Sequence, residues 1–300
     1  MKVLALGLSA ALAACTVGSG ATSAGGGGGG GGTGPDAAVT PGGISGHIAT
    51  STTWMDTVNI VGDTTIDAGA TVTVMPGAII NIAANANVII LGTLSAVGTS
   101  AGKITIQPAN AAPHFGSPDS GITVGASAAG GTLTMNYVNM TGGSLRAVGS
   151  GAATIKDSTF SQADGDMLQM ADTASMDFEY SSIGMATAGT DTTHCDMHFA
   201  SGVALGTIKV SHSNVSTSSY GVMFYAGTNA DFTYDNWFLN TTTNVDPTVG
   251  QVSGDFSNGY FDANPPMAVT GITANTLSTT MLATCLSDAS NDASCAGPHR

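Results

Sequence analysis

The sequence predicts an all-β protein built as a parallel β-helix, a solenoid of short strands stacked coil upon coil. Between Thr57 and Pro108, β-prone runs of three to five residues alternate with Gly, Pro, Asp or Asn turns, and no helical period is present. From Gly131 onward a second motif recurs at steps of roughly twenty residues or more. Strands this short bury little apolar surface alone, so they become stable when each coil stacks on the next.

The chain begins with a basic residue and a short apolar run, and small residues precede Cys15. This order is typical of a secretory signal peptide, and the run is too short for a membrane span. Residues 12–15, Leu-Ala-Ala-Cys, resemble the lipobox of bacterial lipoproteins. The resemblance implies cleavage before Cys15, acylation of its sulfur and, because residue 16 is not Asp, an outer-membrane or cell-surface location. An ordinary signal peptide with an accidental cysteine is the alternative.

The next segment, 15–46, is almost free of large apolar residues and contains eight consecutive glycines at 25–32. Gly-rich chain behaves as a flexible coil, so we expect a disordered tether. A phosphate-binding glycine loop is a poor alternative, because no Lys-Ser/Thr pair follows. The predicted order is a signal peptide at 1–14, the linker at 15–46, the β-helix at 47–266, and a C-terminal cap or tail at 267–300 after the Pro265-Pro266 break.

The second motif has the form apolar–x–x–Ser/Asn–x–apolar–polar. Its aligned apolar residues, separated by 20, 23, 32 and 23 positions, are Met140, Phe160, Ile183, Val215 and Phe238. Steps in the low twenties fit one turn of a parallel β-helix, and the long step predicts an insertion of about nine residues between Ile183 and Val215. We expect the apolar residues to form a stacked core and the Ser and Asn residues to form ladders at the bends.

The opening coils carry a family resemblance. Pro76-Gly77 follows a Val-x-Val strand, and 92–98 reads Gly-Thr-Leu-Ser-Ala-Val-Gly. These features resemble the first coils of right-handed, single-stranded parallel β-helix proteins of the pectin-lyase-like class. The resemblance implies the fold and its handedness. It does not imply one activity, because this architecture serves lyases, hydrolases, adhesins and noncatalytic surface proteins.

The net charge of the chain limits the classes of partner that it can bind. The chain has 20 acidic residues against six Lys and Arg, for a net charge of −14. Such a surface repels phosphate backbones, so we expect no nucleic-acid partner. The scarcity of Lys and Arg also argues against an anionic polysaccharide as a ligand, because anionic sugars need positively charged partners. All the acids except Glu179 are Asp, which favours turn formation as their main role.

Four cysteines are present. With Cys15 acylated, three remain in an exported protein, where disulfides form. Cys285 and Cys295 lie ten positions apart in a polar tail, and we expect them to be bridged. Cys195 is then unpaired, and we expect it to be buried.

The richest candidate site is the run Thr192-Thr193-His194-Cys195-Asp196-Met197-His198. On a strand, His194, Asp196 and His198 share one face and Cys195 faces the other. Two imidazoles and a carboxylate could hold zinc or another divalent ion, with His212 stacking from a neighbouring coil. The alternative is a polar ladder on an outer face.

A second candidate is Asp164-Gly165-Asp166, with Asp172 nearby. Two close carboxylates can bind calcium or act as an acid–base pair, and a plain Asp-Gly turn is the alternative. The catalytic signatures of pectin-degrading enzymes are missing, so we assign no catalytic residue and no cofactor other than such a divalent ion.

Together these observations predict a noncatalytic, lipid-anchored β-helix protein at the cell surface, acting as an adhesion or carbohydrate-contact module. Its expected partners are the membrane, through the lipid anchor, and polysaccharide. The alternative is a polysaccharide lyase or glycoside hydrolase of the same fold with an unrecognised site.

Overall fold

The computed structural model describes residues 42–116, 118, 120–184, 189–199, 207–224, 229–246, 253–263, 282–286 and 296–299. The predicted signal peptide and tether, with Cys15, lie outside these residues, and so does Cys295. In the described part, the chain forms 26 strands and a short 3-10 turn at Ala109–Ala111. No helix among the described residues is long and apolar enough to cross a membrane.

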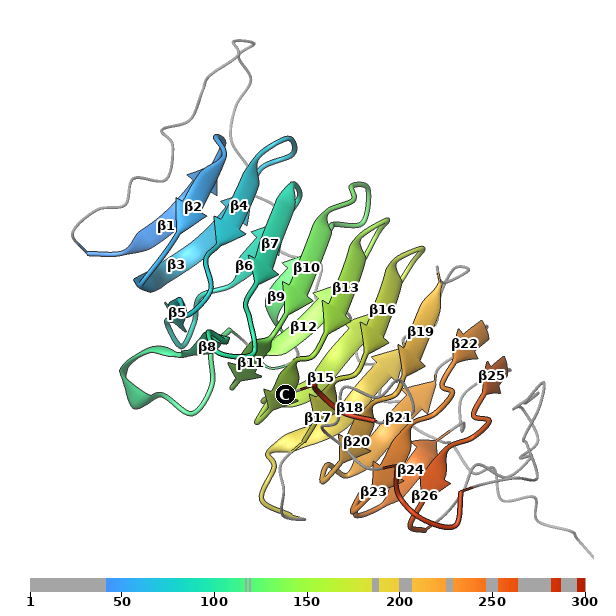
Figure 1. Cartoon of the computed structure of the whole chain (residues 1–300). Coiled ribbons are helices and arrows are strands. Elements are labelled where there is room, and N and C mark those ends of the chain that lie inside the picture. The colour runs from blue at the N-terminus through green and yellow to red at the C-terminus, as the bar shows by residue number, and fades with distance from the viewer. Residues whose placement is uncertain are drawn as a thin grey trace, which may run out of the picture. The chain divides into compact units, whose positions relative to one another are not determined.

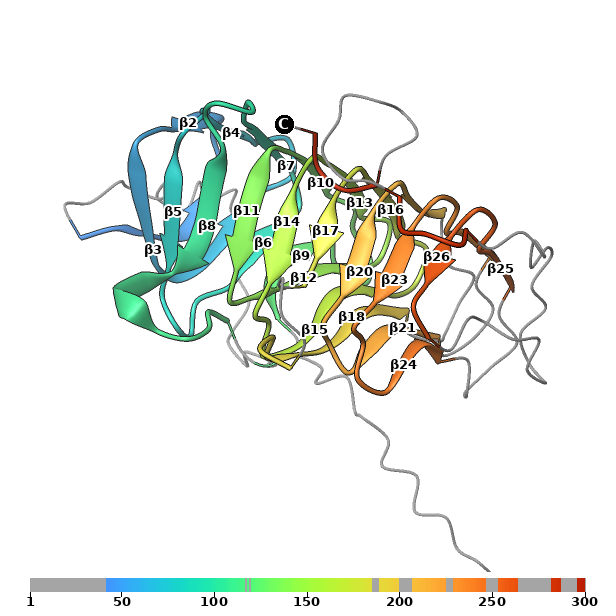
Figure 2. The same cartoon turned by 60° about the horizontal axis from the view of Figure 1, so that its bottom comes forward.

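The strands stack in three columns, with one strand from each coil in each column (Figures 1 and 2). The first column is the nine-stranded sheet: β2 (Thr52–Trp54), β4 (Thr71–Val74), β7 (Thr93–Val97), β10 (Thr132–Asn136), β13 (Ala152–Lys156), β16 (Ser175–Glu179), β19 (Ile208–Ser211), β22 (Asn229–Asp231) and β25 (Ser253–Asp255). The described chain therefore makes nine coils.

The other two columns form one 17-stranded sheet, because β3 (Thr57–Ile66) continues through the bend between them. After the first part of β3, the second column contains β5 (Ile79–Ile82), β8 (Ile104–Pro108), β11 (Val138–Thr141), β14 (Thr159–Ser161), β17 (Ser182–Ile183), β20 (Asn214–Ser216), β23 (Asn236–Phe238) and β26 (Tyr260–Phe261). The third contains β1 (Ile44–Ile48), the second part of β3, β6 (Val88–Ile90), β9 (Gly121–Val124), β12 (Ser144–Ala147), β15 (Gly165–Met170), β18 (Thr193–Phe199), β21 (Tyr220–Phe224) and β24 (Thr243–Asp246).

Neighbouring coils pair in parallel in all three columns, as in β4 with β7, β5 with β8 and β6 with β9. The predicted all-β, right-handed, single-stranded parallel β-helix is confirmed. Parallel pairing of consecutive coils follows from the sequence, because every coil places its short apolar runs at matching positions.

The core lies inside the coils and follows the alternation of each strand. Val72, Ile80, Val88 and Leu94, from three different columns, are all at most 3% exposed. Later coils fill the same interior with larger rings, including Phe160, Phe178, Phe199, Phe232 and Trp237, each 0% exposed. Phe232 stacks on Phe256 with ring centroids 4.7 Å apart, so aromatic contacts continue from coil to coil.

The predicted repeat alignment is confirmed at three steps and wrong at the last. Met140 pairs with Phe160, Phe160 with Ile183, and Ile183 with Val215. Val215, however, pairs with Trp237, not with Phe238. Trp237 is 0% exposed whereas Phe238 is half-buried, so the larger ring takes the core position. The step is therefore 22 residues, not 23.

The predicted nine-residue insertion is confirmed, and it is distributed over three places around β18. The difference in residue number between paired residues is 23 at Phe160/Ile183 and 28 at Gly165/Thr193. It then rises to 29 at Asp166/Cys195 and to 32 at Met176/Ile208. Five residues enter before β18, one enters as a β-bulge within it, and three enter after it. The candidate site lies on this strand.

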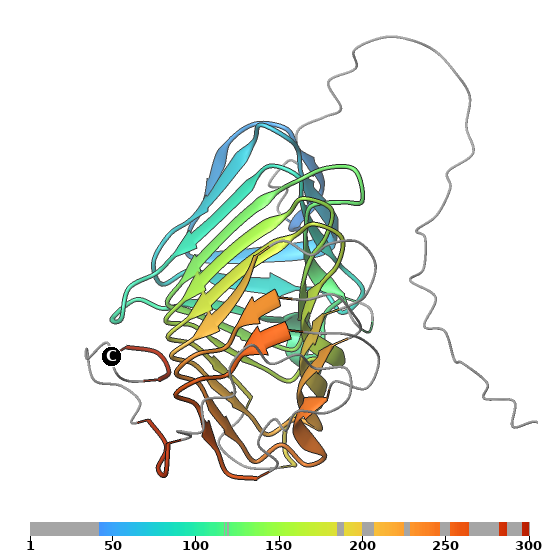
Figure 3. The same ribbon diagram turned by 90° about the vertical axis from the view of Figure 1, so that its right-hand side faces the viewer.

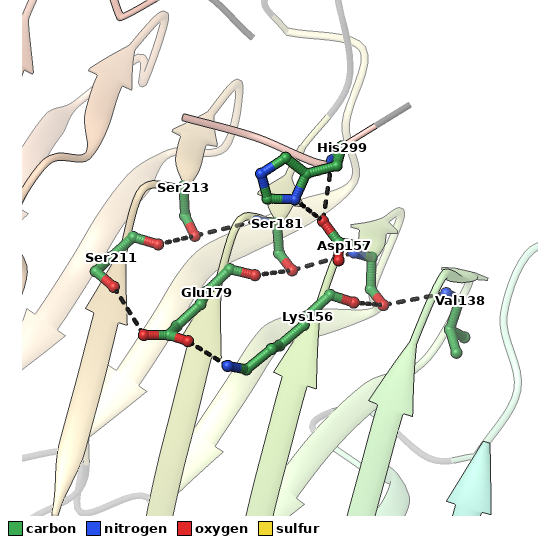
Figure 4. Close-up of polar contacts among 9 residues, drawn as sticks. Val138, Lys156, Asp157, Glu179, Ser181, Ser211, Ser213 and His299 are labelled. Atoms are coloured by element: carbon green, nitrogen blue, oxygen red, sulfur yellow. Dashed lines mark hydrogen bonds and ion pairs between the residues drawn. The ribbon is translucent and has the colours of Figure 1, made fainter. Parts of the chain in front are cut away.

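The predicted ladders are present at the bend between the first and second columns (Figure 4). The backbone N–H groups of Val138, Ser158 and Ser181 donate to the side-chain oxygens of Ser158, Ser181 and Ser213 at 3.1, 3.1 and 3.2 Å. The Ser213 N–H donates to Asp235 Oδ1 at 2.8 Å. We call Ser158, Ser181, Ser213 and Asp235 the bend ladder. It satisfies buried backbone donors that the sheets cannot reach.

The C-terminal segments lie beside the coils (Figure 3). The Leu282 N–H donates to the Gly259 carbonyl at 3.1 Å, and the Gly297 N–H donates to the His212 carbonyl at 2.6 Å. Asn236 exchanges two hydrogen bonds with the backbone of Leu286. These segments therefore pass from the last coil back toward earlier coils. The predicted cap at the open end of the helix stays a prediction, because 264–281 lie outside the described residues.

Candidate functional site

One carboxylate joins two imidazoles on the third column, where Asp166 lies on β15 and both histidines lie on β18. Asp166 Oδ1 lies 3.1 Å from His194 Nδ1, and Asp166 Oδ2 contacts His198 Nδ1. We call Asp166, His194 and His198 the imidazole cluster. The sequence analysis had placed Asp166 in one candidate site and the two histidines in another.

The β-bulge explains how Asp166 reaches His194. Gly165 pairs with Thr193 but Asp166 pairs with Cys195, so His194 is the extra residue of β18. A bulge twists its strand locally and re-aims the side chain that it carries. The side chain of His194 is 55% exposed and that of His198 is 23% exposed, so both rings reach the surface. The Tyr220 ring lies 5.2 Å from that of His194.

This arrangement has a definite chemistry. When Nδ1 of each ring donates a hydrogen to the carboxylate, Nε2 of each ring carries the lone pair. The carboxylate then fixes the tautomer and the orientation of both rings. Two oriented imidazoles can accept hydrogen bonds from a ligand, or act as a general base.

The other predicted ligands are not brought to this cluster. Asp196 is 0% exposed, and neither of its carboxylate oxygens has a hydrogen-bond partner. Asp164 is exposed in the connection between β14 and β15, away from the histidine contacts of Asp166. His212 lies at a different bend. Among the described residues, no three His, Cys, Asp or Glu side chains are arranged to hold a metal ion.

Cys195 is buried behind the cluster, as expected from the strand alternation. It is 0% exposed, and its thiol donates to the Met197 carbonyl at 2.7 Å. Burial, followed by the nearby charges of Asp166 and Asp196, raises the pKa of the Cys195 thiol well above its ordinary value. The thiol therefore stays protonated, and Cys195 is a structural residue and not a nucleophile.

A charged cluster lies on the outer face of the first column, and Figure 4 shows two of its members, Lys156 and Glu179. Lys156 Nζ lies 2.6 Å from Glu179 Oε2, and Lys209 Nζ contacts Glu179 Oε1. Burial raises the pKa of Glu179, but its hydrogen bonds and charge contacts with the two lysines outweigh burial and lower the pKa overall. The hydrogen bond to Glu179 is the main cause that raises the pKa of each lysine. We call these three residues the lysine–glutamate row.

Beside this row, rings stack at the bend. His212 lies between Tyr180 and Tyr234, with ring centroids 4.8 and 4.9 Å apart, and the His299 ring lies 4.4 Å from that of Tyr180. We call these four residues the ring stack. Burial is the main cause that lowers the pKa of His212. Tyr180, His212 and Tyr234 have φ values of 47°, 53° and 63°, a conformation uncommon outside glycine. Each directly precedes a member of the bend ladder, which holds the bend in place.

Sequence reasoning missed the ring stack and the lysine–glutamate row, although the repeat motif contains their signal. Successive copies read Lys-Asp-Ser at 156–158, Glu-Tyr-Ser at 179–181 and Ser-His-Ser at 211–213. The first residue of each triplet places Lys156 against Glu179, and the second residue places Tyr180 against His212. The two residues before each Ser differ in type from copy to copy, so the repeat motif itself does not display this pairing.

Comparisons with protein-family models, with curated proteins and with solved structures find no match to this chain. The fold and the site therefore define the class only by geometry: a parallel β-helix protein with polar and aromatic rows along its outer faces.

Proposed function

We propose that this protein is a noncatalytic β-helix protein of the cell surface, anchored by lipid on Cys15, that contacts carbohydrate along one flank of its coils. It belongs, in this proposal, with the pectin-lyase-like surface proteins that its opening coils resemble. The observation that carries the proposal is the ring stack beside the lysine–glutamate row, because this flank repeats the same kinds of groups from coil to coil.

Such a flank suits a linear sugar polymer. Coils repeat at about 4.8 Å, so equivalent side chains recur along the direction a polymer would follow. Tyr hydroxyls, imidazole nitrogens and lysine ammonium groups hydrogen-bond to sugar hydroxyls. The bend ladder fixes the backbone below the rings, which reduces the ordering that binding requires.

The charge balance favours a neutral glycan. Lys156 and Lys209 both contact Glu179, so their charges are already partly compensated. The whole chain carries a net charge of −14. An anionic polysaccharide would meet repulsion that a neutral one avoids.

A glycan array probed with the full-length protein in detergent tests this proposal. We expect binding to neutral polysaccharide that falls at least tenfold in Tyr234→Ala and His212→Ala. Leu239→Ala is the matched control, because Leu239 is 41% exposed against 40% for Tyr234 and follows β23 at another bend. Binding that persists in both ring variants would contradict the proposed flank.

The anchor is tested separately. Mass spectrometry of the mature N-terminus should find acylated Cys15, and Cys15→Ser should release the protein from the membrane fraction. Membrane retention of the Cys15→Ser protein would contradict the lipid anchor and leave the carbohydrate proposal standing.

The imidazole cluster favours a second function, a polysaccharide lyase or glycoside hydrolase of the same fold. Asp166 orients two imidazoles, and Tyr220 beside His194 could supply a proton. Steady product release from neutral or acidic polysaccharides that disappears in His198→Ala and Asp166→Asn, but not in His212→Ala, would support this enzyme. No release from any substrate, or release that both cluster variants retain, would exclude it.

A further inference from the structure

Asp196 is the least explained side chain in the described part of the chain. By the alternation of β18 it belongs to the same face as His194 and His198, yet it is 0% exposed. Neither Oδ1 nor Oδ2 has a hydrogen-bond partner. An ionised carboxylate buried without a partner is among the most costly arrangements in a protein, and a bound cation is one way to remove the cost.

A second carboxylate lies close to it. Asp191 Oδ1 accepts from the backbone N–H groups of Gln162 and Thr193, both at 2.9 Å. These two N–H donors fix the position of the Asp191 carboxylate. Its other oxygen, Oδ2, is buried and has no hydrogen-bond partner. Asp191 is also the charged group that acts most strongly on Asp196. Three buried oxygens of two neighbouring carboxylates are thus unsatisfied.

The groups around this pair do not neutralise it. Ser218 is the polar side chain that faces Asp196 and favours its charged form, but its hydroxyl has one hydrogen, for which the Tyr220 carbonyl at 2.6 Å and Asn240 Oδ1 at 3.2 Å compete. His194 and His198 are bound to Asp166 instead. None of the ion pairs within the described ranges includes Asp191 or Asp196.

We propose that Asp191 and Asp196 bind a calcium ion, with Ser218 Oγ as a neutral ligand and water completing the shell. Calcium takes six to eight oxygen ligands in flexible geometry, and carboxylates are its preferred protein ligands. The nearby imidazoles are engaged and the Cys195 thiol stays protonated, so a hard cation fits this site better than zinc.

The ion would have a structural role. Asp191 belongs to the insertion before β18, Asp196 lies on β18 itself, and Ser218 lies at the bend before β21 in the next coil. Calcium would tie the inserted segment to two successive coils below the imidazole cluster. This site shares Asp196 with the first metal hypothesis, but it uses none of His194, His198, Asp164 and Asp166.

The test uses the full-length protein stripped with EDTA and titrated with CaCl2, MgCl2 or ZnCl2. We expect one calcium per chain by calorimetry and a rise in Tm with millimolar CaCl2, both lost in Asp196→Asn and in Asp191→Asn. Asp164→Asn is the matched control, because it removes an exposed carboxylate of the same region and should keep binding unchanged.

The same experiment includes a control that shows whether the variants fold. In EDTA, Asp196→Asn should melt at or above the wild-type temperature, because the variant lacks the uncompensated charge. If Asp191→Asn does not fold, Asp196→Asn alone decides. The proposal is overturned if wild type binds no calcium at millimolar concentration, if Asp196→Asn retains binding, or if Asp164→Asn abolishes it. It is also overturned if acidification raises the Tm but calcium does not, since the pair would then share a proton.

Discussion

His299 binds Asp157, which lies 142 positions earlier in the chain, through both its backbone and its ring (Figure 4). Its N–H donates to Asp157 Oδ1 at 3.0 Å, and its Nδ1 lies 2.5 Å from the same oxygen. Asp157 occupies, in its coil, the left-handed position that Tyr180 and His212 occupy in the next two coils. The His299 ring, next to Tyr180, therefore supplies the member of the ring stack that this coil lacks.

Removing the Asp157 carboxylate should release the C-terminal segment. We expect Asp157→Ala to speed hydrogen exchange at the Gly297 amide by about tenfold to a hundredfold, because a charge-assisted hydrogen bond contributes about 1.5–3 kcal/mol. Exchange mass spectrometry or NMR measures it. Asp172→Ala, which removes the acceptor of the Gly149 N–H at another bend, is the control. Equal exchange at Gly297 in wild type and Asp157→Ala would show that the segment is held by other contacts.

The bend ladder ends in a residue that fits it poorly. Ser158, Ser181 and Ser213 each accept from one backbone N–H and donate to the carbonyl two residues before them, at 2.6, 2.8 and 2.9 Å. Asp235 accepts from Ser213 in the same way, but its Oδ2 is buried without a hydrogen-bond partner. Burial is the main cause that raises the pKa of Asp235 well above its ordinary value of 3.8.

Asp235→Ser should therefore stabilise the protein at pH 7, by about 1 kcal/mol, by replacing a misfitting carboxyl with the group used in the other coils. Because the folded pKa of Asp235 is raised, the folded state binds more protons than the unfolded state between the two pKa values. Wild-type stability from this residue therefore increases as pH falls from neutrality, and the variant should lose that increase. Urea denaturation at pH 7 and pH 5 measures both effects.

The control is Ser181→Ala, which leaves the buried Ser158 N–H without its acceptor and should cost about 1–3 kcal/mol. If Asp235→Ser is destabilising at pH 7, the Asp235 carboxylate has a favourable partner that the ladder geometry does not explain.

The sequence predicted the coils well and the site poorly, for a physical reason. Strand positions such as Val72 and Ile80 are set by local alternation and turns, which a single chain displays directly. Asp166 meets His194 only because a bulge and an insertion shift β18 by six residues relative to β15. The repeat spacing indicates the insertion, but neither its division around β18 nor the bulge has a local signal. Strand alternation assigns Asp196 to the face of the histidines, but it cannot show that this position is buried.

Acidification should weaken the contacts between Glu179 and the two lysines of the lysine–glutamate row. The pKa of Glu179 lies below its ordinary value of 4.5, so its favourable contacts are present at neutral pH and are lost as pH falls through the folded pKa. The lysine ends are about 40% exposed, so solvent screening limits the contribution to about 1 kcal/mol.

We expect Glu179→Gln to reduce stability at pH 7 by about this amount, and we expect this effect to disappear as pH falls through the lowered folded pKa of Glu179. Equilibrium unfolding from pH 3 to pH 7 measures the difference in the free energy of unfolding between wild type and Glu179→Gln. The buried aspartates are present in both proteins, so their opposite pH trend cancels in this difference. A difference that stays constant across this range would show that Glu179 acts by packing and not by charge.

Phe115 is packed against Gly143, the residue before β12. The ring is 1% exposed, and a Cβ on Gly143 would overlap three of its atoms. The neighbouring His114 ring lies 3.2 Å from Thr192, in the connection that also carries Asp191. Gly143→Ala should therefore cost about 1–3 kcal/mol by overpacking, and Gly42→Ala, which meets no atom within 4 Å, is the control.

In Phe115→Leu the outer ring atoms are absent, so adding Gly143→Ala should cost less there than in wild type. A double-mutant cycle by urea denaturation measures this coupling, and strictly additive effects would show that the two residues do not share this space.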